Sequence, residues 1–172
     1  MNDRIFMGEN KERIQNCPNI VTLCVDSYDF RRQDGRMYHR YTDCPISFSS
    51  LFDALGQMDA FFDDLQLPWP STILRSFSAG RRTEHHTGGK CRALPGISEK
   101  RKEMKEMESF DQVIGHRGKD ATFVIRVQHR QHSSWQGEVT WVDGQKKEYF
   151  RSALELVRLI DGVLNDAEDD GA

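Results

Sequence analysis

The alternation of apolar and polar residues over positions 121–150 constrains the fold of this chain more than any other feature of its sequence. The stretch starts with apolar residues at every second position, Phe123, Ile125 and Val127, as in a strand with one buried face. Two further strand-like runs flank Asp143-Gly144, a dipeptide typical of tight hairpin turns. Positions 121–150 therefore predict a three-stranded antiparallel meander.

A helix is predicted directly after the meander. Ser152 and Glu155 have the spacing of a capping box, in which the hydroxyl accepts from a first-turn amide and the carboxylate reaches back. The residues that follow are apolar at helical spacing: Leu156, Val157, Ile160, Val163 and Leu164. Residues 121–165 are therefore predicted to form a strand-strand-strand-helix unit, and 166–172 an acidic tail.

Residues 19–66 carry a similar pattern. Apolar residues alternate from Val21 to Val25, and Asp34-Gly35 predicts a turn into a second strand. Ser50, with Asp53 three residues later, predicts the start of an amphipathic helix that ends before two prolines. The segment is predicted to contain two strands, an optional third strand and a helix.

A shift of 102 residues superimposes the two units without a gap. It places Gly35 on Gly137 and Ser50 on Ser152. A glycine between strands and a serine at a helix N-cap are residue types that the local backbone geometry favours. The shift indicates an internal repeat, with chance similarity as the alternative. The sequence thus predicts one α+β domain over 1–172, in which two pseudo-repeated strand-strand-strand-helix halves form an antiparallel sheet system with packed helices.

Residues 67–120 are predicted to link the two halves. The part from 78 to 97 is rich in glycine and in basic residues, a composition typical of a surface loop. A polar helix is predicted to start at Ser98 as N-cap and to end at Gly115, with an apolar stripe that includes Met107 and Phe110.

Membrane and secreted classes do not fit the sequence. No apolar run approaches the roughly 18 residues of a membrane-spanning helix, and the first residues are polar. The four cysteines lack C-x-x-C spacing and are too few for a disulfide-rich secreted protein. We therefore expect free thiols, a cytoplasmic location and no membrane partner.

Motifs for catalysis or cofactor binding are incomplete. Lys90 follows two glycines, but a phosphate-binding loop would need glycine in place of Glu84 and Ser or Thr in place of Cys91. The histidines lack the paired spacing of zinc ligands, and no nucleophile elbow is present. The sequence predicts no cofactor and no metal, and it favours a protein without catalytic residues.

The strongest functional signal is a basic strand face. Alternation predicts that four polar side chains project together beside a tryptophan at the hairpin tip: Arg126, Gln128, Arg130, His132 and Trp135. The linker adds four basic residues: Arg81, Arg82, Lys90 and Arg92. Such a surface suits phosphates and stacked bases, although it also fits an ordinary solvated strand. Because the formal net charge is −3, any nucleic-acid site would have to be local.

A surface for a protein partner is the other interpretation. Trp135 is predicted to be exposed, and tryptophan is a frequent anchor of interfaces, whereas Trp141 follows the inward alternation and is predicted to lie in the core. We expect a non-catalytic cytosolic protein that binds an unknown protein partner, as a regulator or inhibitor. It would be a monomeric pseudo-dimer or a homodimer. RNA or single-stranded DNA binding is the alternative.

The second half also resembles a known group of proteins. The strings Phe123-Val-Ile-Arg-Val, Ser134-Trp-Gln-Gly137 and Phe150-Arg-Ser-Ala-Leu-Glu-Leu156 resemble an uncharacterised family of small bacterial proteins from Firmicutes, which carry a Trp-Gly hairpin followed by a Phe-Arg-Ser-x-x-Glu-Leu helix start. The resemblance covers about the last 50 residues and implies the bacterial cytosol, without an assigned activity. The first half departs from it, with Asp34 in place of Gln136 and Ser49 in place of Arg151.

Overall fold

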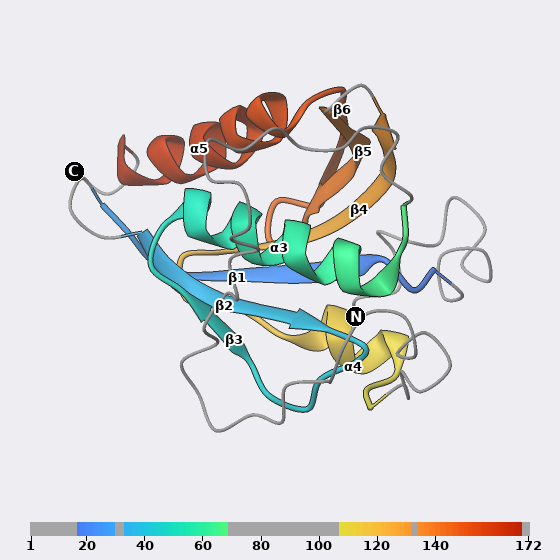
Figure 1. Ribbon diagram of the computed structural model, residues 1–172. Coiled ribbons are helices and arrows are strands. Elements are labelled where there is room, and N and C mark those ends of the chain that lie inside the picture. The colour runs from blue at the N-terminus through green and yellow to red at the C-terminus, as the bar shows by residue number, and fades with distance from the viewer. Residues whose placement is uncertain (1–16, 30–32, 69–106, 132–133, 170–172) are drawn as a thin grey trace.

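The computed structural model describes residues 17–29, 33–68, 107–131 and 134–169. Six strands form one antiparallel sheet in the order β3-β2-β1-β4-β5-β6 (Figure 1). The strands are β1 (Ile20–Tyr28), β2 (Gln33–His39), β3 (Ile46–Phe48), β4 (Ala121–Gln131), β5 (Ser134–Trp141) and β6 (Lys146–Phe150). The helices are α3 (Leu51–Leu65), α4 (Phe110–Gly115) and α5 (Ala153–Asp169). The chain is therefore α+β, as predicted.

The two long helices cover one face of the sheet, and α4 lies against the other (Figure 1). The main core forms where α3 and α5 meet the inward side chains of the strands, and it includes three fully buried phenylalanines: Phe62, Phe123 and Phe150. A smaller core joins α4 to the opposite face through Phe110, Ile114, Ile20, Val124 and Val142. The strand alternation predicts one buried face and therefore understates the burial, because residues 20–25 of β1 and 121–125 of β4 are buried on both sides of the sheet.

The structure corrects the predicted linker helix where it describes it. Residues 107–109 are not helical, and α4 begins only after its N-cap, Ser109, which forms a capping box with Gln112. The amides of Met107 and Glu108 both donate to the carbonyl of Arg40, so this segment is fixed to the end of β2 instead of continuing a helix. The predicted loop at 78–97 and the start of the predicted helix at Ser98 lie outside the described residues.

The β1–β2 and β4–β5 hairpins have the same register at a spacing of 102 residues. Val25 pairs with Gly35, and Val127 pairs with Gly137; in each hairpin a bulge follows directly. Both glycines also face the edge strand, where Gly35 pairs with Phe48 and Gly137 with Phe150. A Cβ atom at Gly35 would lie 2.5 Å from the Phe48 ring, and one at Gly137 would lie 3.0 Å from the Phe150 ring. Each glycine thus leaves room for an aromatic ring.

One strand pair joins the two halves of the sheet. In the β1–β4 ladder, Thr22 pairs with Val124, which is also its counterpart at the 102-residue spacing. Among the helices that the structure describes, none is long and apolar enough to cross a membrane.

Candidate functional site

The predicted basic strand face does not form. The bulge after Val127 reverses the alternation, so that Arg126 lies on the α4 side of the sheet whereas Arg130 lies under α3. The prediction that the two arginines project together is wrong, because it assumed an unbroken period of two across a position where the ladder slips. The half-buried Gln128 lies at this bulge, between the two orientations.

Both arginines pair with carboxylates. Arg126 lies 3.3 Å from Glu138, whose second oxygen lies 2.9 Å from the ammonium of Lys147. Arg130 is 6% exposed and pairs with Asp59, at 3.0 Å, and with Asp63, both of them on α3. A phosphate at Arg130 would have to displace Asp59 and Asp63 and reach a guanidinium that is almost fully buried.

Trp135 is half-buried, so the prediction that it is exposed is wrong. Its ring meets Phe62 edge-on, with centroids 5.6 Å apart, and it packs against the main core. Trp141 is half-buried as well and packs against the same core, in line with its predicted inward alternation. His132 and the linker residues Arg81, Arg82, Lys90 and Arg92 lie outside the described residues.

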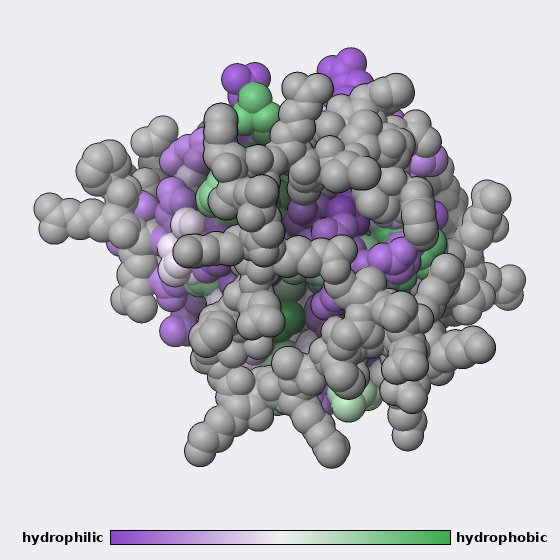
Figure 2. All heavy atoms as spheres, in the orientation of Figure 1, coloured by the Kyte–Doolittle hydropathy of each residue, from purple (hydrophilic) through white to green (hydrophobic). Residues whose placement is uncertain are grey.

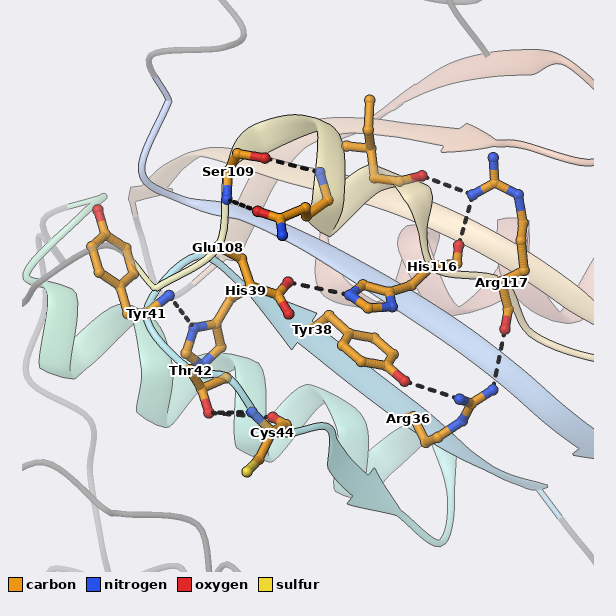
Figure 3. A network of polar contacts seen from close by, with 12 residues as sticks. Arg36, Tyr38, His39, Tyr41, Thr42, Cys44, Glu108, Ser109, His116 and Arg117 are labelled. Atoms are coloured by element: carbon orange, nitrogen blue, oxygen red, sulfur yellow. Dashed lines mark hydrogen bonds and ion pairs between the residues drawn. The ribbon is translucent and has the colours of Figure 1, made fainter. Parts of the chain in front are cut away.

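The structure assembles a polar network that the sequence did not reveal (Figure 3). Arg36 in β2 forms a two-pronged ion pair with Asp26, at 2.6 and 2.7 Å, and also donates to the hydroxyl of Tyr38 at 2.9 Å. The guanidinium further donates to the carbonyl of Arg117, 81 residues away in the sequence. The hydrogen bond from Arg36 holds the pKa of Asp26 below its usual value.

The ring of Tyr38 continues the network toward α4. It stacks on His116, with centroids 3.6 Å apart and an angle of 10° between the planes. His116 Nε2 lies 3.2 Å from the carboxylate of Glu108, which precedes α4 (Figure 3). Burial raises the pKa of Tyr38. The protonated phenol of Tyr38 therefore connects β2 to the residues that flank α4, Glu108 before it and His116 after it.

The network offers no activated nucleophile. Cys24, which lies opposite Arg36 in the ladder, is buried, and this burial raises the pKa of its thiol to about 12. A thiol with this pKa stays protonated at neutral pH, and the thiolate is the reactive form. Within the described ranges, no group of three or more His, Cys, Asp or Glu side chains could hold a metal ion.

A buried histidine belongs to the core. His39 stacks on Phe61 with centroids 4.0 Å apart, and its Nδ1 accepts a hydrogen bond from the amide of Tyr41 at 3.2 Å. Desolvation lowers the pKa of His39 to about 4. The ring is therefore neutral at physiological pH, and its accepting nitrogen is Nδ1.

The helix layer carries two exposed apolar side chains at equivalent places. Phe52, in the first turn of α3, is 85% exposed, and Leu154, in the first turn of α5, is 62% exposed. In the view of Figure 2, hydrophobic side chains of the described residues occur as separate spots among hydrophilic ones. A sequence signal existed for both residues, since each is an apolar residue two positions after an N-cap serine and outside the helical apolar stripe.

No family model matches the sequence, and no curated protein and no solved structure matches it either. The resemblance of the second half to a bacterial family therefore stays a prediction.

Proposed function

We propose that this chain is a non-catalytic binding protein of the bacterial cytoplasm, whose helix layer contacts a protein partner and so regulates or inhibits it. The exposure of Phe52 and Leu154 at equivalent places on two helices carries the proposal. A large apolar side chain in water gains nothing for folding, and its removal from water on binding is favourable. Scattered exposed apolar residues are ordinary, but two at one position of two matching helices need a common cause.

We also propose that the two halves are copies of one strand-strand-strand-helix unit. The 102-residue spacing holds for the hairpin register, the two bulges, the glycines under aromatic rings and the helix caps. A monomeric pseudo-dimer is the arrangement that this spacing supports.

The charges favour a protein over RNA or single-stranded DNA. The two arginines that were expected to contact phosphates are paired with carboxylates on opposite sides of the sheet. Helix α3 contains four aspartates and no Lys or Arg, so the helix layer repels a polyanion. Nucleic-acid binding stays the alternative, and the experiment below distinguishes it from binding of a protein.

A pull-down with matched variants tests the proposal. Tagged full-length protein is incubated with nuclease-treated bacterial lysate at low and high salt, as wild type and as the Phe52→Ser, Leu154→Ser double variant. Tyr149→Ser, which removes another exposed aromatic side chain on β6, is the control. We expect a discrete protein at both salt concentrations with wild type and control, but not with the double variant.

Two results would count against this function. If the double variant retains the same protein as wild type, the helix layer is not the contact surface. Nucleic acid that is retained without nuclease and lost at high salt would favour the alternative, because phosphate contacts weaken steeply with salt. Equal melting temperatures of the three proteins would show that the substitutions leave the fold intact.

A further inference from the structure

We propose that the peptide unit between Arg40 and Tyr41 is an acid-sensitive latch, which opens when His39 takes up a proton and then releases residues 107–116 from the end of β2. We call residues 107–116 the strap; it consists of residues 107–109, helix α4 and His116. The latch requires no binding partner, so it stands or falls separately from the proposed function.

The peptide unit of the latch is hydrogen-bonded on both of its sides. Its N–H, from Tyr41, donates to Nδ1 of His39 at 3.2 Å (Figure 3). Its carbonyl, from Arg40, accepts from the amide of Met107 at 2.7 Å and from that of Glu108 at 3.2 Å. The N–H and C=O of a planar trans peptide point in opposite directions, so neither group can turn without the other. The imidazole therefore holds the carbonyl toward the strap.

The surroundings of His39 favour the neutral ring. It stacks on Phe61 of α3 with centroids 4.0 Å apart, the ring of Tyr41 lies 6.3 Å away, and Val21 is its neighbour in the β1–β2 ladder. The phenol of Tyr41 is the titratable group of this set. Burial, without a contribution from a charged side chain, lowers the pKa of His39 to about 4. Among the described residues, no carboxylate therefore compensates an imidazolium at this place.

A proton on His39 places two donors against each other inside the latch. Nδ1 is the accepting nitrogen of the neutral ring, so the added proton binds there and turns Nδ1 into a donor that faces the N–H of Tyr41. A buried donor without an acceptor is costly, and a buried charge without a partner is costlier. Both costs are relieved when the peptide unit rotates and the imidazolium reaches water. The same rotation turns the Arg40 carbonyl away from the strap.

The other end of the strap is attached to β2 by groups that also titrate. His116 Nε2 lies 3.2 Å from the carboxylate of Glu108, and its ring stacks on Tyr38. Arg36 donates to the hydroxyl of Tyr38. Arg117 donates to the carbonyl of His116. An imidazolium donates from both ring nitrogens, so a proton on His116 keeps the pair with Glu108, and the acid-sensitive end is the latch at His39.

Release of the strap exposes the smaller core. Phe110 and Ile114 of α4 are buried against Ile20, Val124 and Val142 on this face of the sheet. Once the latch is open, these apolar side chains lose the contacts that remove them from water. Acid thus converts a covered face of the sheet into an exposed apolar one while the two long helices stay on the other face.

Amide hydrogen exchange of the full-length protein tests the latch. Exchange at Met107 and Glu108 is followed by NMR at pH 7 and at pH 5, and each rate is divided by the intrinsic rate of that amide at the same pH. The pKa of His39 is about 4 in the closed latch and 6.5 in a solvated ring, so we expect the open population to rise about 20-fold between these pH values. The amides of the β1–β4 ladder should exchange more slowly at both, because that ladder stays closed.

Two substitutions of His39 separate the proton from the ring. His39→Asn supplies a side-chain carbonyl that accepts a hydrogen bond but does not titrate, and His39→Phe keeps an aromatic ring without an acceptor. Both variants should lose the rise at pH 5, and His39→Phe should exchange faster than wild type at pH 7. His116→Gln is the matched control, because it removes the titratable ring of the strap and should keep the rise.

Three results would overturn the latch. Equal protection of Met107 and Glu108 at the two pH values would show that opening takes up no proton. A rise that persists in His39→Asn, or that disappears in His116→Gln, would assign the titrating group to another residue. Exchange of the strap amides at the rate of the β1–β4 ladder amides would mean that the whole domain unfolds instead of the latch.

Discussion

The hydroxyl of Tyr28 donates a hydrogen bond to the carboxylate of Asp161, 133 residues away, and thereby ties the end of β1 to the middle of α5. Its counterpart in the other half is an ion pair instead, between Arg130 and Asp59. One contact is a hydrogen bond and the other is an ion pair, but each connects the first strand of one half to the helix of the other half. They suggest that neither helix is held only by its own half.

The Tyr28 contact predicts a measurable loss on deletion of one oxygen atom. Tyr28→Phe should lower the free energy of unfolding by about 1.5–3 kcal/mol, since the hydrogen bond is to a charged group. Urea denaturation followed by circular dichroism measures the change. Tyr149→Phe, which alters an exposed tyrosine, is the control and should stay within about 0.5 kcal/mol of wild type.

Arg130 is predicted to serve folding more than binding. Arg130→Ala removes the partner of Asp59 and Asp63 and the cation over the Phe62 ring, and should cost about 1–3 kcal/mol because the two carboxylates keep partial contact with water. A variant that kept wild-type stability but lost nucleic acid in the pull-down would contradict this assignment and support the phosphate-binding alternative.

His39 predicts a pH dependence of stability. Its pKa is about 4 in the folded protein and about 6.5 in an unfolded chain, so between these values only the unfolded state takes up the proton. The free energy of unfolding should therefore fall as the pH drops below about 6.5, by up to about 3 kcal/mol near pH 4. His39→Phe should lack this part of the slope in denaturation curves measured from pH 7 to pH 4. An unchanged slope would show that His39 is not the titrating group.

Cys24 is predicted to be inert in the folded protein. With a pKa of about 12, only about one molecule in 10⁴ carries the thiolate at pH 8. Alkylation by iodoacetamide, followed by mass spectrometry of the peptides, should leave Cys24 unmodified in buffer and modify it in urea. Fast alkylation in buffer would mean that β1 opens readily to solvent.

The sequence predicted the elements better than it predicted the site. Strand alternation, the Asp143-Gly144 turn and the caps Ser50 and Ser152 are local signals, and the structure has strands and helices where they stand. The predicted turn at Asp34-Gly35 is wrong, because both residues lie within β2 and pair with β1. Arg130 was misplaced because a bulge has no clear local signal in a run of polar residues. The contacts of Tyr38 with His116 join residues far apart in the chain, and no periodicity encodes such a pair.

The glycines under the aromatic rings give the sharpest test of the hairpin geometry. A Cβ atom at Gly35 would lie 2.2 Å from the carbonyl oxygen of Cys24, and one at Gly137 would lie 2.1 Å from that of Arg126. Since these neighbours are backbone atoms that cannot yield cheaply, Gly35→Ala and Gly137→Ala should each cost about 1–3 kcal/mol.

Gly162 in α5 is the matched control, because a Cβ atom there meets nothing within 4 Å. Gly162→Ala should stabilise the protein by about 0.5–1 kcal/mol through the better helix propensity of alanine. Opposite signs in urea denaturation would thus separate the close approach at the hairpin glycines from a general effect of the added methyl group. Similar losses at all three positions would contradict the close approach as the cause of the loss, since the methyl group would then act without regard to its neighbours.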